Sequence, residues 1–142
     1  MAGDNAEIVT RLNDALNRAR AEGKEIEQGI ADVAELLDPG IEFVNPPEAI
    51  DPGVRHGIDG WITAFKNLRE GLGLNRVDIE RLEEAGDLVA TAIVLHGKAP
   101  GSGIEMPFPA RGGLWTVRQG RLTRFEWFVE PEDAFARLEQ AG

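Results

Sequence analysis

Glu126 is the residue whose type and setting best suit acid and base chemistry, because it lies between two aromatic residues. Two runs of alternating apolar residues meet at Gln119-Gly120, and this pattern predicts a β-hairpin. A carboxylate in such a strand requires a partner, a cavity or solvent. Inside an apolar cavity it would bind a proton more readily, which suits a general acid and base. On a solvated face it would form an ion pair with Arg124 or Arg111.

The alternation assigns the side chains of the last strand to two faces of a sheet. Leu122, Glu126 and Phe128 share one face, whereas Phe125 and Trp127 point to the other. We expect the first face to line an interior pocket, which makes Glu126 a candidate catalytic residue. Because the other face also carries large apolar groups, we expect a second copy to cover it, giving a homodimer through the outer sheet face. A monomer with two aromatic residues on its surface is the alternative.

Two further polar residues are candidates for the same site. Arg111 shares a strand face with Gly113 and could hold a developing oxyanion or a ligand carboxylate. A surface arginine beside glycines in a turn is the alternative. Asn45 could orient a ligand through its amide, although an asparagine before Pro46 is also an ordinary end of a strand.

The remaining polar motifs do not predict a metal or a cofactor. His56 lies in a glycine-flanked loop, where it could titrate near neutrality, and His96 is expected to face away from the pocket. Neither histidine has a second ligand at a spacing typical of metal sites. Gly71-Leu72-Gly73 ends a helix without a preceding strand, which is the wrong context for binding dinucleotide phosphates.

Composition excludes several classes of partner. The chain carries 15 Lys and Arg against 25 Asp and Glu, a formal net charge of −10, so its field repels nucleic acid and anionic membrane surfaces. With no cysteine, disulfides and thiolate chemistry are excluded. The amino-terminal residues lack the pattern of a secretory signal, and we expect a cytoplasmic protein. The length of 142 residues predicts one domain over 1–142.

Helices are predicted first and strands second. Helical spacing of apolar residues predicts helices within 4–19, 26–37 and 58–72, and a proline after the last strand predicts a closing helix from residue 131. A period of two predicts a short strand at 41–45 and further strands from 75 to 129. This order predicts an α+β fold in which helices pack on one face of an antiparallel sheet.

Three local motifs, at 37–43, 56–61 and 125–135, together with this order of elements, resemble the nuclear transport factor 2-like superfamily. The second and third motifs are most similar to uncharacterised SnoaL-like proteins, relatives of polyketide cyclases. The resemblance implies a cone-shaped, curved antiparallel sheet wrapped around three N-terminal helices, the cystatin-like roll. Such motifs specify a fold more than a chemistry.

One known activity of the superfamily does not carry over to this sequence. Ketosteroid isomerases pair an aspartate base with a tyrosine and a protonated aspartic acid. By pattern, the tyrosine falls on Leu12, the base on Asn45 and the second aspartate on or near Gly113. All three functional groups are lost, which excludes a standard ketosteroid isomerase.

Two other activities are matched in part. Limonene epoxide hydrolases use an acid on the last strand and an asparagine, which fall on Glu126 and Asn45. Their tyrosine becomes Phe43, and their Arg/Asp pair falls near Ile93 and Leu95. SnoaL-like cyclases rely on one acidic side chain in an apolar cup, a role that Glu126 could fill.

These observations predict a pocket for a small apolar molecule, such as one that bears a carbonyl group. Cofactor-free acid/base catalysis of the isomerase, cyclase or hydrolase type would use Glu126 as proton carrier and Arg111 or Asn45 to stabilise the oxyanion. The alternative is a non-catalytic ligand-binding or dimeric accessory module. Core packing is the competing interpretation of both tryptophans in the predicted pocket wall. The expected pocket residues are Leu12, Phe43, Trp61, Phe65, Ile93, Leu95, Trp115 and Phe128.

Overall fold

The computed structural model describes residues 4–49, 52–72, 74–98, 105–107 and 109–141, with the backbone alone for 68–72, 98, 105–107 and 141. None of the helices in these ranges is long and apolar enough to cross a membrane. The helices are α1 Asp4–Ala21, α2 Ile26–Ala31, the 3-10 turn η1 Ala34–Leu36, α3 Gly57–Leu72 and α4 Pro131–Ala141. The strands are β1 Leu37–Asn45, β2 Gly53–His56, β3 Arg76–Ala85, β4 Leu88–Lys98, β5 Glu105–Pro107, β6 Arg111–Arg118 and β7 Arg121–Phe128.

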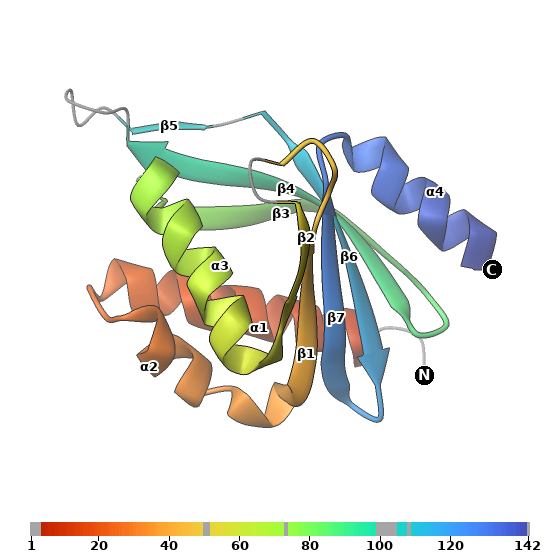
Figure 1. The fold of residues 1–142 in the computed structure, drawn as a ribbon, viewed down its shortest axis with the longest axis horizontal. Helices are drawn as coiled ribbons and strands as arrows, with labels where there is room; N and C mark the ends of the chain where they lie inside the picture. The colour runs from red at the N-terminus through yellow and green to blue at the C-terminus, as the bar shows by residue number, and fades with distance from the viewer. Residues whose placement is uncertain (1–3, 50–51, 73, 99–104, 108, 142) are drawn as a thin grey trace.

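The strands form one curved sheet in the order β2-β1-β7-β6-β4-β3, and β5 pairs with β4. All pairs are antiparallel except β1 with β7. Helices α1, α2 and α3 lie on the concave side, here called the inner face, and α4 lies on the opposite, outer face (Figure 1). The predicted α+β cone around three N-terminal helices is therefore confirmed.

A β-bulge in β7 changes which side chains reach the inner face. Thr116 pairs with Arg124 and Val117 pairs with Leu122, so Thr123 is an extra residue in β7. Side chains on the two sides of a bulge no longer follow a simple alternation. Leu122 therefore joins the inner face.

The face assignment predicted from the alternation is wrong for this strand. Leu122 and Phe125 lie in the inner core, and Trp127 packs against that core. Phe128 packs instead against the outer cluster under α4, and Glu126, two residues before it, shares its face. Glu126 and Phe128 therefore point away from the interior in which they were expected, because the bulge separates them from Leu122.

Helix α4 covers apolar residues of the outer face. Its residues Ala134, Phe135 and Leu138 form a buried cluster with Leu114 of β6 and Ala90 of β4. The close approach requires a glycine in β6, since a Cβ on Gly112 would lie 3.0 Å from the Ala134 Cβ. Part of the apolar surface that predicted a second copy is thus covered within the chain. The homodimer stays a prediction.

Two elements differ from the sequence expectation near β1. The helix predicted over 26–37 ends at Ala31 and is followed by η1, because Leu37 already pairs with Leu122 of β7. The loop predicted around His56 contains β2, which pairs His56 with Glu42 of β1. Gly57 then turns the chain into α3 with a φ of 78°, a backbone conformation that favours glycine.

Helix α1 is fastened to the edge strand β3. The Asn17 side chain donates to the Val77 carbonyl oxygen at 2.7 Å and accepts from the Val77 N–H at 2.9 Å. Asn13 donates to the same carbonyl at 3.0 Å. At the other end of α1, the Ala6 N–H donates to the Glu84 carboxylate at 3.0 Å. These bonds fix α1 across the inner face.

Candidate functional site

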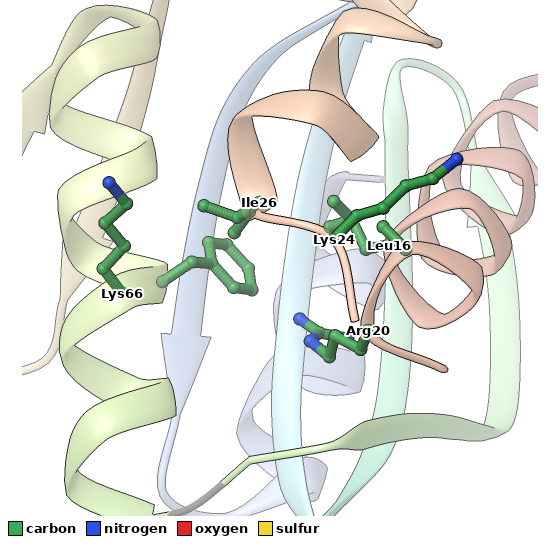
Figure 2. Close-up of a pocket in the computed structure, with 7 residues that line it drawn as sticks. Leu16, Arg20, Lys24, Ile26 and Lys66 are labelled. Atoms are coloured by element: carbon green, nitrogen blue, oxygen red, sulfur yellow. The ribbon is translucent and has the colours of Figure 1, made fainter. Parts of the chain in front are cut away.

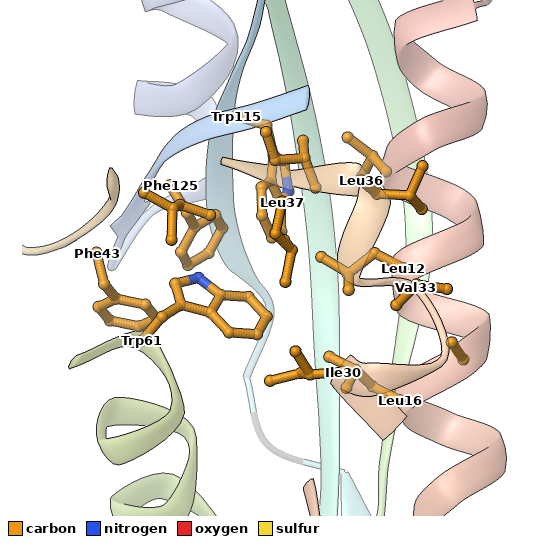
Figure 3. Close-up of a cluster of buried hydrophobic side chains, with 14 of the residues drawn as sticks. Leu12, Leu16, Ile30, Val33, Leu36, Leu37, Phe43, Trp61, Trp115 and Phe125 are labelled. Atoms are coloured by element: carbon orange, nitrogen blue, oxygen red, sulfur yellow. The ribbon is translucent and has the colours of Figure 1, made fainter. Parts of the chain in front are cut away.

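Five aromatic rings contributed by four elements fill the centre of the inner face. On α3, the Phe65 ring centroid lies 4.3 Å from that of Trp61 and 5.6 Å from that of Phe43 on β1. The Phe125 ring of β7 lies 5.3 Å from Phe43 and 4.4 Å from Trp115 of β6. Figure 3 shows Phe43, Trp61 and Phe125 at one side of the core, with aliphatic side chains toward α1. The rings pack against one another as in a protein core.

A glycine makes this packing possible. Gly113 of β6 lies under the Phe125 ring, and a Cβ there would be 2.9 Å from its Cε1 atom. The same Cβ would be 2.7 Å from the Thr91 hydroxyl oxygen, which donates to the Gly113 carbonyl at 3.3 Å. No side chain at position 113 fits without displacing Phe125. The place of the second isomerase aspartate is therefore occupied by an aromatic ring.

Trp61 brings a fully buried indole N–H into this cluster. The residue is 0% exposed, and its Nε1 has no hydrogen-bond partner within the described part of the chain. A buried N–H that gives up its bond to water without a replacement costs about 1–3 kcal/mol. An acceptor that reached Trp61 would recover that free energy.

Asn45 and Trp127 are joined at the end of the sheet where β1 and β7 finish and β6 begins, here called the distal end. The Trp127 Nε1 donates to the Asn45 Oδ1 at 2.7 Å. Asn45 therefore faces inward, as its candidate role required. Its side-chain oxygen already accepts the hydrogen bond from Trp127. Trp127 was missed in the sequence analysis because the alternation placed it on the other face.

Arg111 also belongs to the inner side of the distal end. It lies two residues from Gly113 and four from Trp115, and its partner in β4 is Ile93. Its Nη1 lies 3.4 Å from the Val129 and Ala110 carbonyl oxygens, at the limit for a hydrogen bond. The guanidinium is thus partly buried and weakly held.

Glu126 lies on the outer face in an array of charged side chains. Its Oε1 is 3.8 Å from the Arg124 guanidinium and 3.7 Å from that of Arg137 on α4, and the side chain is 17% exposed. Arg124 also lies 3.9 Å from the Glu42 carboxylate. The ion pair with Arg124, which was the alternative interpretation from the sequence, is the arrangement observed. The sheet separates Glu126 from the aromatic cluster.

The two histidines lie outside the inner face. His56 Nδ1 is 3.6 Å from the Glu42 carboxylate, and the His96 Nε2 is 2.9 Å from Asp78. A hydrogen bond from Arg76 at 2.6 Å lowers the pKa of Asp78 below its usual value, and the charges of Arg76 and His96 act in the same direction. Within the described ranges, no group of three or more metal-ligating side chains is arranged to hold an ion.

The predicted pocket residues separate into three groups. Leu12, Phe43, Trp61, Phe65 and Trp115 belong to one inner core. Ile93 and Leu95 pair with Ile79 and Val77 at the distal end of the inner face. Phe128 lies on the outer face. The sequence thus identified most of the apolar residues of the inner face but placed Glu126 there, whereas it lies on the outer face.

A narrow slot opens beside the aromatic cluster, between α1, α2 and α3 (Figure 2). Its volume is about 10 Å³, room for about one water molecule. Phe65 belongs both to the slot and to the aromatic cluster, so one ring separates the slot from Trp61. The other side chains that line the slot include Leu16, Arg20, Lys24, Ile26 and Lys66.

The sequence model of the SnoaL-like domain matches residues 9–125. The chain belongs to the SnoaL-like domain family. The matched range includes the inner-face aromatic cluster and the slot. No curated protein matches the chain.

Solved structures with the same fold cover nearly the whole chain. A protein from Jannaschia sp. CCS1, named after the SnoaL-like polyketide cyclases, aligns with a TM-score of 0.69 at 22% identity over 97% of this chain and 93% of that one. An NTF2-like protein of unknown function from Burkholderia pseudomallei gives a TM-score of 0.68 at 18% identity over 95% and 96%. TerC, co-crystallised with polyporic acid, gives 0.66 at 20% identity over 96% and 98%. At these identities the similarity shows the fold.

Proposed function

We propose that this SnoaL-like protein binds a small, largely apolar molecule that carries a carbonyl oxygen, in the aromatic interior between α3 and the sheet. The unpaired N–H of the fully buried Trp61 is the observation that carries this proposal. A carbonyl oxygen accepts one hydrogen bond without bringing a charge into the apolar interior. The rings around Trp61 offer flat apolar surfaces to the rest of the molecule.

Binding is favoured over acid/base catalysis by the side chains on the inner face. The described residues of β4, β6 and β7 that face inward include no carboxylate, and Glu126 is held in outer-face ion pairs. The polar groups that do face inward are donors or amides, such as Trp61, Arg111 and Asn45. These groups can orient a ligand and stabilise negative charge, but they do not accept a proton near neutral pH.

Space for the ligand would come from Phe65. This side chain is partly buried and lines the slot, so its rotation toward solvent would join the slot to the region beside Trp61. The crystal of TerC with polyporic acid is an example of this fold together with a small molecule. Ligand affinity would then include the cost of moving one aromatic ring.

A pair of ligands that differ in one oxygen tests the proposal. 1-Tetralone and tetralin have the same bicyclic skeleton, and only the first has a carbonyl group. Thermal-shift and tryptophan-fluorescence titrations should show that 1-tetralone binds about 2- to 13-fold more tightly, which corresponds to one hydrogen bond of about 0.5–1.5 kcal/mol. The Trp61→Phe variant should bind both compounds equally. Equal affinity of the unaltered protein for both compounds, or no binding of either, would refute the proposal.

A further inference from the structure

We infer that the ligand also carries a carboxylate, held by Arg111 at the distal end of the inner face. This inference rests on the proposed function, because it adds an anionic group to the same apolar molecule. It concerns the distal end of the sheet rather than Trp61, so the two groups of the ligand can be tested separately.

Arg111 is a partly buried cation without a carboxylate partner. In the part of the chain that the structure describes, its guanidinium contacts only the carbonyl oxygens of Ala110 and Val129, both at 3.4 Å. Arg118 and Arg121 also lack an ion pair with any described residue, but both are exposed and keep their water. Charged side chains that lose water are normally paired with an opposite charge. The charge of Arg111 is thus left for an anion from outside the chain.

The inner face around Arg111 offers further donors and little bulk. Gly113, two residues along β6, has no side chain. The Asn45 side-chain oxygen accepts from Trp127, while the N–H groups of the same amide have no partner among the described residues. Only β7 separates β1 from β6, so Asn45 and Arg111 lie on strands roughly 10 Å apart. A carboxylate accepts hydrogen bonds from both types of group, and the guanidinium can hold its two oxygens at once.

An apolar surface joins Arg111 to the aromatic cluster. The ring centroid of Trp115 lies 6.3 Å from that of Trp61. Trp115 is four residues from Arg111 on β6, which corresponds to about 13 Å along a strand. Phe125 and Trp127 of β7 add apolar rings to the same face. The structure thus favours an apolar oxo acid whose carbonyl group and carboxylate are several carbon atoms apart.

The test uses 6-oxo-6-phenylhexanoate and its neutral amide, which share the aromatic ketone. In fluorescence titrations at low ionic strength we expect the acid to bind about tenfold more tightly than the amide, and this preference to shrink at high salt. The net charge of −10 opposes any such preference unless a cation lies at the site. Benzoylformate, whose carboxylate adjoins its ketone, should bind no more tightly than benzoylformamide.

Three variants assign the preference to Arg111. Arg111→Gln should remove it, whereas Arg111→Lys should retain part of it, because lysine keeps the charge but not the fork of N–H groups. Asn45→Asp keeps an acceptor for the Trp127 N–H but replaces the amide donors with a negative charge, so the preference should fall. Arg118→Gln is the matched control, because it removes the same charge from the exposed other end of β6.

Four results would overturn the inference. Equal affinity for 6-oxo-6-phenylhexanoate and its amide would do so, and so would a preference that survives Arg111→Gln or, if that variant does not fold, Asn45→Asp. A loss of the same size in Arg118→Gln, or an equal preference for benzoylformate over its amide, would show a general charge effect. In each case a retained preference for 1-tetralone over tetralin would leave the proposed function intact. If no aromatic ketone binds, the proposed function itself fails.

Discussion

Truncation of Phe65 to alanine should weaken the fold and strengthen ligand binding at the same time. A fully buried Phe→Ala change costs about 3–5 kcal/mol, and Phe65 is only partly buried. The variant also loses the ring contacts with Phe43 and Trp61, of about 0.5–1.5 kcal/mol each, which are part of that total. We therefore expect a loss of about 3 kcal/mol, or roughly 10 °C in Tm for a chain of this length.

The binding of 1-tetralone should become about tenfold tighter in the same variant. In the unaltered protein the ligand must displace the ring, whereas in Phe65→Ala the space is already open. Urea denaturation measures the stability, and titration of tryptophan fluorescence measures the affinity. Since α3 positions Trp61, circular dichroism must show that the helix is retained.

Ile62→Ala is the matched control for this experiment. Ile62 lies on the same helix and packs against the same core, but it does not line the slot. Its truncation should destabilise the protein without improving the affinity. Weaker or unchanged binding in Phe65→Ala, with α3 intact, would refute the reasoning that Phe65 separates the slot from the interior.

Three further changes probe other parts of the structure. Glu126→Gln should leave the affinity for 1-tetralone unchanged, because Glu126 lies in outer-face ion pairs. The free energy of unfolding should fall by less than about 1 kcal/mol. A large loss of affinity in titration would contradict the placement of Glu126 on the outer face. Gly113→Ala should lower the free energy of unfolding by about 1–3 kcal/mol, because the new Cβ would lie 2.7 Å from the Thr91 hydroxyl oxygen. An unchanged urea midpoint would contradict this packing. Folding lowers the pKa of Asp78, so this carboxylate should stabilise the folded state at pH values above its unfolded pKa of about 3.9. The stabilisation should be lost as the pH falls through the lower pKa of the folded state. Arg76→Gln should therefore lower the urea midpoint slightly at pH 7 and leave it unchanged at low pH, where Asp78 is protonated.

The order of elements was predictable because binary patterns specify it. Periods of 3.6 and 2 located α1, α3 and the later strands, and Pro131 marked the start of α4. The helix predicted over 26–37 was too long because its apolar spacing continues into Leu37, which tertiary pairing places in β1. Short β2 was missed since Gly53–His56 has no alternating apolar pattern and depends on its pairing with β1.

The walls of the inner face were predictable, and so was the inward placement of Asn45 and Arg111, but the position of Glu126 and the unpaired Trp61 N–H were not. A bulge leaves no mark in the pattern of apolar residues, so Thr123 could not be recognised as the extra residue of β7. Because the bulge was not recognised, Glu126 and Phe128 were assigned to the inner face and Trp127 to the outer face, the reverse of the observed arrangement. The Trp61 N–H was missed for another reason: whether an indole nitrogen finds a partner depends on contacts between elements, which only the folded chain provides.

The attachment of Asn17 to the Val77 backbone has a consequence for behaviour in concentrated solution. An unprotected border strand is a template on which other molecules add strands, the first step of fibril growth. Here a helix lies against that border at one end and occupies the donor and acceptor of Val77. The opposite border, Gly53–His56, is only four residues long. Strand addition is thus hindered at the Val77 end of one margin and limited by the short length of the other, and replacing Asn17 by leucine would leave the Val77 N–H without its side-chain partner.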